Sequence, residues 1–345
     1  MGARPDVVVV GAGIVGLSIA FHLAERGAAV KVVDRAGIGA GASGLQPGGV
    51  RQQWGTRLNC LLVQESVRFY ADAVEGLRMR VDPGFRNCGY LFIAHSETTL
   101  EQLRANVSLQ VSLGIRSRIV SPPEAAELVP GLNVSSVVGG AWNGDDGYFD
   151  RPQSILEALG ELVEVEIAEV HHVRELSGSE VVVAAGAETA RLLPELPIGP
   201  ERRDLFFSDP IRERLLEPLV VSPERGFAAK QLADGRLLAS DLNTGERTNV
   251  RFAFEELLPR LVYVALPTRV EGVYDVTPDH QPILGRVRDE VWVAAGFSGR
   301  GFMVAPAVGR IVAEAVLGEA WDPLLNVLDA RRFEEGRLVP EPTVV

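Results

Sequence analysis

The sequence is poor in cysteine and contains no long apolar segment. Its two cysteines, Cys60 and Cys88, form no CxxC pair, which is too little for a disulfide framework or a zinc site and fits a reducing compartment. No run of about 18 apolar residues occurs that could span a membrane. The residues before Val7 offer no apolar signal-peptide core. We therefore expect a cytoplasmic protein with no transmembrane segment and no bound metal.

An excess of positive charge is also missing. Lys and Arg together number 34 against 46 Asp and Glu, which gives a formal net charge of −12. Nucleic acids and anionic membrane surfaces repel such a chain, so neither is an expected partner. Hydrophobic residues make up 46% of the sequence, which is enough for a core, and 345 residues correspond to about two domains.

Apolar periodicity divides the chain into strands and helices, with no internal repeat. We expect strands over residues 7–10, 29–34, 90–95, 137–142, 181–185 and 291–295. Helices are expected from Ile14 to a stop at Gly27 and over residues 56–78, 96–113, 152–160 and 304–317. Residues 36–49 are too rich in Gly, Ala and Ser for a regular element. The short β-like runs and turns of residues 200–275 predict a mainly antiparallel sheet. His171 and His172 fall on a further expected strand and are taken as structural.

A glycine-rich turn gives the strongest signal for function. Gly11, Gly13 and Gly16 form a GxGxxG motif that directly follows a strand and opens a helix, the context of a dinucleotide-binding βαβ unit. The free N–H groups at the helix start would meet a pyrophosphate, and Asp34 at the end of the next strand would accept hydrogen bonds from a ribose. The residues expected to contact the cofactor here are Gly11, Gly13, Ile14, Val15, Gly16, Asp34 and Arg35.

The motif alone does not separate FAD from NAD, but two other glycine-rich segments favour FAD. The first offers backbone amides and a hydroxyl near the phosphates, from Ala42, Ser43, Gly44, Gly48 and Gly49. The second opens a C-terminal helix, whose N-terminus would stabilise negative charge on a reduced flavin, and contributes Gly296, Gly299, Arg300, Gly301, Phe302 and Met303. An ordinary glycine-rich loop is the alternative for this second segment.

The first and last segments share this chemistry, whereas the middle of the chain differs. We therefore expect an α/β fold in which a Rossmann-like FAD-binding domain receives an inserted, mainly antiparallel-sheet substrate domain. The expected FAD-binding domain covers residues 1–82, 147–200 and 279–345, and the substrate domain covers residues 83–146 and 201–278.

The chain also resembles the D-amino-acid-oxidase-like family of FAD flavoproteins, which includes sarcosine oxidase, glycine oxidase and D-amino-acid dehydrogenases. The segments that carry the resemblance follow one another in the same order as in the family. The matching segments are VVVVGAGIVGLSIAFHLAERGAAVKVVD, GAGASG, GGVRQQW, LVPGLNVSSVVGGAWNGDDGYFDRP, VVVAAGAETA, YDVTPDHQPILG and AAGFSGRGFMVAPAVG. The resemblance implies further cofactor contacts at Val170, Ala185 and Gly186. It also implies that an amino-acid or amine substrate loses a hydride from its amine-bearing carbon to flavin N5, giving an imine that hydrolyses.

The substrate's carboxylate requires an anchor, for which the guanidinium fork of an arginine is suited. Arg51, just after the first flavin loop, is the first choice, and Arg300 is the second candidate for a contact with the flavin or the substrate. Tyr274 and His280 lie in the segment that resembles the family's TPD turn. For Arg51, Arg300 and His280 a purely structural or solvent-exposed position is the alternative.

The sequence departs from the family at three positions. Val273 stands where monomeric sarcosine oxidases carry the cysteine that binds flavin, so FAD should be held non-covalently. Tyr274 stands about where glycine oxidases place a carboxylate-binding arginine, which argues against that identity. Met303 stands where monomeric sarcosine oxidases place a lysine used in oxygen activation, which favours a dehydrogenase or slow oxidase over a fast oxidase. The segment of residues 163–183 is also shorter than the segment that usually precedes the AAG motif in this family.

We therefore predict an FAD-dependent dehydrogenase or oxidase of an amino acid or N-methyl amino acid, with oxygen or another electron acceptor as its second partner. Two alternatives stay open. One is an FAD-dependent 2-hydroxy-acid dehydrogenase, for which His280 is the candidate base. The other is a flavin subunit of a larger electron-transfer complex, which would bind FAD without turnover on its own.

Overall fold

The computed structural model describes residues 6–77, 79–176 and 179–342, and over these residues the first sheet has six strands. Their order is β16-β17-β10-β1-β2-β9. Five strands are parallel, and β16 pairs antiparallel with β17. Their bounds are β1 Val7–Val10, β2 Val30–Asp34, β9 Glu164–Ile167, β10 Glu180–Val183, β16 Ile283–Arg288 and β17 Val291–Ala295.

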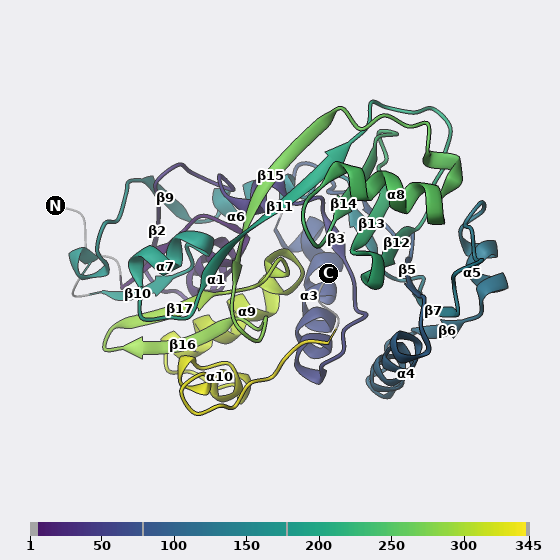
Figure 1. The fold of residues 1–345 in the computed structure, drawn as a ribbon. Helices are drawn as coiled ribbons and strands as arrows, with labels where there is room; N and C mark the ends of the chain where they lie inside the picture. The colour runs from purple at the N-terminus through teal and green to yellow at the C-terminus, as the bar shows by residue number, and fades with distance from the viewer. Residues whose placement is uncertain (1–5, 78, 177–178, 343–345) are drawn as a thin grey trace.

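Both faces of this sheet are covered, as the valine-rich strands require. Alternate residues of β1 enter different cores, Val7 and Val9 on one side and Val8 and Val10 on the other. The first core is closed by α1 Ile14–Glu25, α3 Arg57–Gly76, α6 Gln153–Glu161 and α9 Gly301–Val316 (Figure 1). The second is closed by the short helices η1 Val173–Leu176 and α7 Thr189–Leu192.

The second sheet has eight strands in the described part of the chain, in the order β15-β11-β14-β13-β12-β5-β7-β6. Its neighbours are antiparallel except for the parallel pair β12 and β5. The bounds are β5 Tyr90–Ala94, β6 Arg118–Val120, β7 Gly139–Asn143, β11 Gly199–Phe207, β12 Leu219–Ser222, β13 Phe227–Gln231, β14 Leu237–Asp241 and β15 Thr268–Val276.

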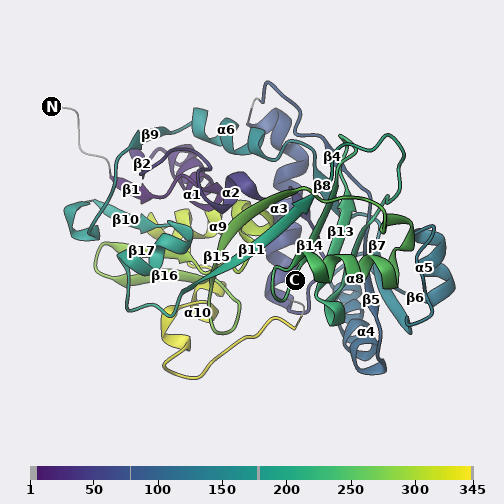
Figure 2. The same ribbon diagram turned by 45° about the horizontal axis from the view of Figure 1, so that its top comes forward.

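Helices also pack on the second sheet. One face carries α4 Glu97–Ser112, and the core of the other face includes α5 Pro122–Leu128 and α8 Arg247–Leu257. A small sheet joins β3 Gly49–Val50, β8 Gly147–Phe149 and β4 Phe85–Arg86. Figure 2 shows the two large sheets side by side, with the long strands β15 and β11, which form one edge of the second sheet, extending toward the first. The remaining short helices are α2 Ala42–Leu45, α10 Leu324–Val327, η2 Gly186–Glu188, η3 Pro223–Arg225, η4 Pro259–Leu261 and η5 Ala330–Arg332.

These elements confirm the expected α/β class, with one mainly parallel and one mainly antiparallel sheet. Three details differ from the sequence-based expectation. The glycine-rich segment 36–49 contains α2 and the start of β3, because Ser43 and the small residues around it pack on the first turn. The segment 200–275 contains α8 as well as strands. His171 and His172 are exposed and follow β9 in a loop, since β9 ends at Ile167.

One helix end cannot be compared, because the expected end at Arg78 lies outside the described residues. Among the residues that are described, no helix is both long and apolar enough to cross a bilayer.

Candidate active site

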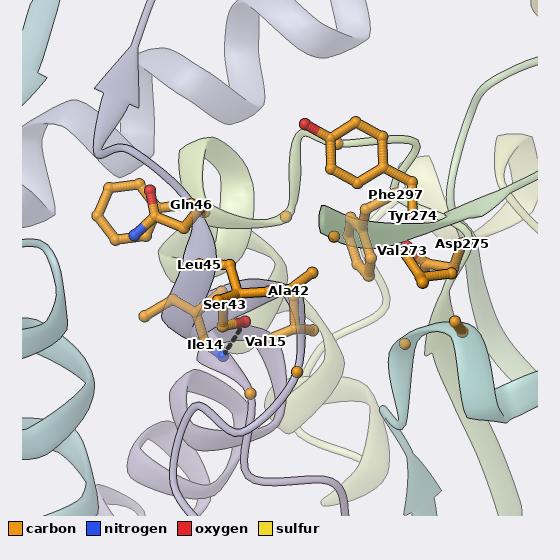
Figure 3. Close-up of a pocket in the computed structure, with 18 of the residues that line it drawn as sticks. Ile14, Val15, Ala42, Ser43, Leu45, Gln46, Val273, Tyr274, Asp275 and Phe297 are labelled. Atoms are coloured by element: carbon orange, nitrogen blue, oxygen red, sulfur yellow. Dashed lines mark hydrogen bonds between the residues drawn. The ribbon is translucent and has the colours of Figure 1, made fainter. Parts of the chain in front are cut away.

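A cavity of about 720 Å³ lies where the two large sheets meet. Its floor is formed by residues at the carboxyl ends of the parallel strands, among them Gly11, Asp34 and Ala184, and its roof by one face of the antiparallel sheet. The carboxyl ends of parallel strands are where open α/β sheets bind ligands. Figure 3 shows Ile14 and Ser43 across the cavity from Tyr274 of the antiparallel sheet and from Phe297, which follows a strand of the parallel sheet.

The first glycine turn forms part of the wall of this cavity. Gly11 has φ +114° and its α-carbon faces the carbonyl of Ala184, so a side chain there would collide with backbone. Gly16 lies against the carbonyl of Gly11, which leaves no room for a Cβ between strand and helix. Gly13 is the N-cap of α1 and has no side chain to occupy the helix N-terminus. The turn therefore leaves backbone open toward the cavity, where a pyrophosphate would lie.

Ser43 and Asp34 frame this N-terminus. The amide of Ile14 donates to Ser43 Oγ at 3.0 Å, which Figure 3 shows as a dashed line. Asp34 Oδ2 accepts from the amide of Ala12 at 2.8 Å, and its Oδ1 accepts from Ala36 at 2.8 Å. Backbone thus fixes the carboxylate at the end of β2, on the wall of the cavity, where a ribose hydroxyl would find an oriented acceptor.

Other expected cofactor residues surround the same space. Those that line the cavity are Gly11, Gly13, Ile14, Val15, Asp34, Arg35, Ala42, Ser43, Gly49, Val170, Ala185, Gly186, Gly299, Gly301, Phe302 and Met303. Gly16, Gly44, Gly48, Gly296 and Arg300 lie outside this lining and shape the turns. Gly44, for example, is packed against the carbonyl of Gly39, and Gly48 takes φ +75° close to the backbone of Phe149.

The second glycine turn also borders the cavity. Gly296, Ser298 and Gly299 have positive φ, and α9 begins two residues later without a side-chain cap. The buried carboxylate of Asp275 accepts from the amide of Gly296 at 2.6 Å and so holds the turn. Burial raises the pKa of Asp275. The open N-terminus of a long helix thus lies at the cavity wall, where Gly301 comes close to Val15 at the start of α1.

Arg51 places a buried positive charge on the wall of this cavity. Its side chain is 3% exposed, donates to the carbonyl of Gln53 at 2.6 Å and stacks on Trp54, with 3.6 Å from Cζ to the ring centroid. Burial lowers the pKa of Arg51 to about 10, which leaves it charged at neutral pH. The hydroxyl of Tyr90 and the carboxylate of Asp146 are close enough to act on this charge.

The other three candidate residues occupy different positions. Tyr274 lines the cavity next to Gly299, and burial raises its pKa. Arg300 is buried outside the lining and donates to the carbonyl of His280 and to Gln281 Oε1. Its Cζ lies over the ring of Trp54, 5.2 Å from the ring centroid. His280 is half-buried with φ 58° and does not line the cavity.

The two cysteines lie away from the cavity wall. Val273 lines the cavity, whereas neither Cys60 nor Cys88 does. No cluster of three or more His, Cys, Asp or Glu side chains in the described ranges is arranged to hold a metal ion.

The sequence analysis missed a buried charged residue of the roof. Lys230 is 1% exposed, lines the cavity, donates to the carbonyl of Pro47 at 2.8 Å and lies 3.9 Å from the ring centroid of Tyr148. Burial lowers its pKa to about 7. Its neighbours on the roof, such as Leu219 and Leu238, are apolar. A lysine within the apolar run of β13 was the available signal, since Ala228 and Lys230 share one face of that strand.

Comparison with known proteins gives a consistent result. Residues 6–315 match the family model described as DAO, FAD dependent oxidoreductase. FAD-dependent oxidoreductase domain-containing protein 1 of Bos taurus is 29% identical over 91% of this chain and 81% of its own length. Sarcosine oxidase subunit beta of Rhodobacter capsulatus is 24% identical over 98% and 91%. The solved L-proline dehydrogenase of P. horikoshii superposes with a TM-score of 0.88 at 27% identity, covering 98% of this chain and all of that one.

Proposed function

The chain belongs to the DAO family of FAD-dependent oxidoreductases, and on this premise we propose that it oxidises the C–N bond of an amino acid or N-methyl amino acid. Enzymes of this amino-acid and amine oxidase family use FAD, and the residues present fit that group. Two helix N-termini without side-chain caps face one cavity, and a side chain at Gly11 would collide with backbone behind it. FAD, when bound, supplies the acceptor for the hydride that leaves the amine-bearing carbon.

The observation that carries the substrate proposal is the position of Arg51. It is a buried guanidinium on the wall of the same cavity that the two glycine turns close. A carboxylate matches the fork of a guanidinium group, so an arginine on the wall of a ligand cavity is suited to bind one. Apolar side chains of the roof, such as Leu219 and Leu238, would keep water away from the reacting carbon. Arg51 is therefore proposed to hold the substrate's carboxylate.

We propose that FAD is bound non-covalently and contacts the cofactor residues given above. Val273 has no nucleophilic atom, and the cavity is not lined by either cysteine. A dehydrogenase is favoured over a fast oxidase because Met303 lines the cavity at the start of α9 without a charge. We also propose that the FAD-binding domain comprises residues 1–82, 147–200 and 279–345, and the substrate domain residues 83–146 and 201–278.

The test is anaerobic reduction of the purified protein. Amino acids of both chiralities, sarcosine, proline and 2-hydroxy acids are added in turn, and loss of the flavin's visible absorbance identifies the substrate. Acid precipitation should release FAD into the supernatant. Reduction by an amino acid supports the proposal, and reduction by hydroxy acids alone contradicts it. A flavin that no compound reduces would indicate an electron-transfer subunit, the role that the similarity to a sarcosine oxidase subunit suggests as the alternative.

A further inference from the structure

The last part of the chain lies against the helix that follows Arg51. After η5, residues 333–342 form no regular element, yet Glu341 is only 5% exposed. Figures 1 and 2 both show this segment leaving α10 and ending beside α3. An irregular segment that buries a carboxylate must satisfy it with specific partners. These partners show what the segment does.

The segment is anchored where it begins. Arg332 and Asp279 form an ion pair in which both side chains are fully buried, with Nε donating to Oδ2 at 2.8 Å and Nη2 to Oδ1 at 2.9 Å. Arg332 also donates to the carbonyl of Gln281 at 2.8 Å, and the amide of Val339 donates to Asp279 Oδ2 at 3.3 Å. The segment is therefore fixed to the turn that precedes β16.

Its other end is fixed to the start of α3. Glu341 Oε1 accepts from the amide of Gly55, and its Oε2 accepts from Thr56 Oγ1 and Asn59 Nδ2, each at 2.7 Å. Thr56 is the N-cap of α3 and makes no capping bond with its own side chain. The carboxylate from the far end of the chain thus provides what a local cap supplies in other helices, and its charge suits the helix N-terminus.

The same carboxylate acts on the buried cations beside it. The Arg51 and Arg300 guanidinium groups both lie at the ring of Trp54, and burial lowers the pKa of each to about 10. Glu341 is the largest of the charges that oppose this lowering for both arginines. Trp54 in turn donates from Nε1 to the carbonyl of Arg51 at 2.9 Å. One short loop, residues 51–56, therefore joins the cavity wall to Glu341.

We propose that Glu341 is a positioning residue for Arg51. Its carboxylate fixes the backbone at Gly55 and Thr56, and thereby holds Trp54 and the Arg51 guanidinium in the orientation that receives a substrate carboxylate. Glu341 does not line the cavity, so it acts through the loop and by its charge. This inference rests on the proposed role of Arg51 in carboxylate binding.

The experiment uses the FAD-loaded enzyme with Glu341→Gln, and Glu335→Gln as the matched control. Glu335 lies on the same segment but is exposed and pairs with Arg337. Benzoate serves as a carboxylate probe and benzamide as its uncharged counterpart, and binding of each is followed by the change in flavin absorbance. We expect Glu341→Gln to weaken benzoate binding about tenfold and to raise KM for an amino-acid substrate more than it lowers kcat. Benzamide binding and the Glu335→Gln variant should be unchanged.

Hydrogen exchange provides a second measurement that does not depend on turnover. Peptides covering residues 51–60 should exchange faster in Glu341→Gln, whereas peptides from α4 should not. Unchanged benzoate binding in Glu341→Gln overturns the proposal, whatever the exchange result. If Arg51→Ala binds benzoate as well as wild type, Arg51 is not the anchor, and that failure of the proposed function also removes the role of Glu341. The two failures are distinguished because only the second appears in the Arg51 variant.

Discussion

Arg51 and Lys230 are two buried cations that line one cavity. Burial opposes charge, so a cation remains charged there only with partners or a ligand. Arg51 keeps its proton at neutral pH even with a pKa of about 10, whereas Lys230 titrates near pH 7. The two residues therefore call for different experiments, one on substrate binding and one on stability.

Replacing Arg51 by alanine should raise KM for a carboxylate-bearing substrate by the equivalent of roughly 2–3 kcal/mol, because a charge-assisted hydrogen-bond pair is lost. FAD content should stay near the wild-type level, since the cofactor contacts lie at the two glycine turns. Arg203→Ala is the matched control, because Arg203 also lines the cavity but pairs with Glu201. Steady-state kinetics decide the point. A KM that rises only in the Arg203 variant would identify Arg203 as the anchor.

Lys230 should make stability depend on pH. Its pKa falls from the ordinary 10.5 to about 7 because burial disfavours the charged form, so between these values the unfolded chain binds more protons than the folded protein. The destabilisation by Lys230 is therefore complete below about pH 7 and disappears as pH rises toward 10.5. Its slope in that window is at most about 1.4 kcal/mol per pH unit.

Thermal unfolding at pH 6, 7.5 and 9, with the pH values chosen to bracket that pKa of about 7, compares wild type with Lys230→Met. The stability of the variant should exceed that of wild type by the largest amount at the lowest pH, and this difference in stability should shrink as pH rises. Lys31→Met is the control, because Lys31 pairs with Glu166 and its pKa is raised, outside this window. A difference between wild type and Lys230→Met that does not vary with pH would show that Lys230 stays charged in the folded protein.

At the scale of elements, the two helix N-termini determine where negative charge is tolerated. The start of α1 is framed by Ser43 and suits phosphates, and the start of α9 borders the same cavity. At that second N-terminus the side chains of Phe302 and Met303 line the cavity and carry no charge. Arg300 lies outside the lining and donates to His280 and Gln281.

Electron transfer from reduced flavin to oxygen builds negative charge, which a fixed cation nearby stabilises. Each reduction of the activation free energy by about 1.4 kcal/mol makes the reaction tenfold faster. We expect the substrate-reduced enzyme to reoxidise slowly in air and to turn over faster with an artificial acceptor. Met303→Lys should accelerate reoxidation about tenfold, and the neutral Met303→Gln should not. Stopped-flow mixing of the anaerobically reduced enzyme with oxygen measures both. Wild-type reoxidation at the rate of a fast oxidase, unchanged by Met303→Lys, would assign oxygen reactivity to another cation of the cavity.

At the scale of the whole molecule, one cavity joins the two large sheets. Residues of the parallel sheet, of the loops that follow its strands and of the antiparallel roof all line this cavity. A ligand there therefore contacts residues from the cores of both sheets. A ligand that binds only the folded state stabilises it by mass action. The cofactor should therefore contribute to the stability of the entire chain.

Removing FAD should lower the melting temperature, and adding it back should restore about 2.7 kcal/mol at a hundredfold excess over Kd. NAD should not replace it. Gly13→Val should abolish the recovery, because a side chain there would enter the space of the pyrophosphate beside Ser43. Gly76→Ala is the control, since nothing lies within 4 Å of a Cβ at that glycine. Calorimetry of the apo and reconstituted forms tests this, and equal melting temperatures would contradict it.

The sequence alone was sufficient for the α/β class, the family and the main elements. Local chemistry is the reason: the turn at Gly11–Gly16, the valine strand before it and the helix start at Gly301 are each set by residues close together in the chain. Helix α8 and the regular structure within residues 36–49 were missed because their form depends on packing against distant elements.

Only the tertiary structure decided which charged residues share the cavity. Sequence gave no means of seeing that Lys230 faces Pro47, that Arg300 turns away from the cavity lining, or that Glu341 caps a helix 285 residues earlier at Thr56. Burial and long-range pairing set these positions, and both depend on how the two sheets pack rather than on spacing along the chain. The sequence thus determined the cofactor class, and the packing of distant segments determined the charges that surround its site.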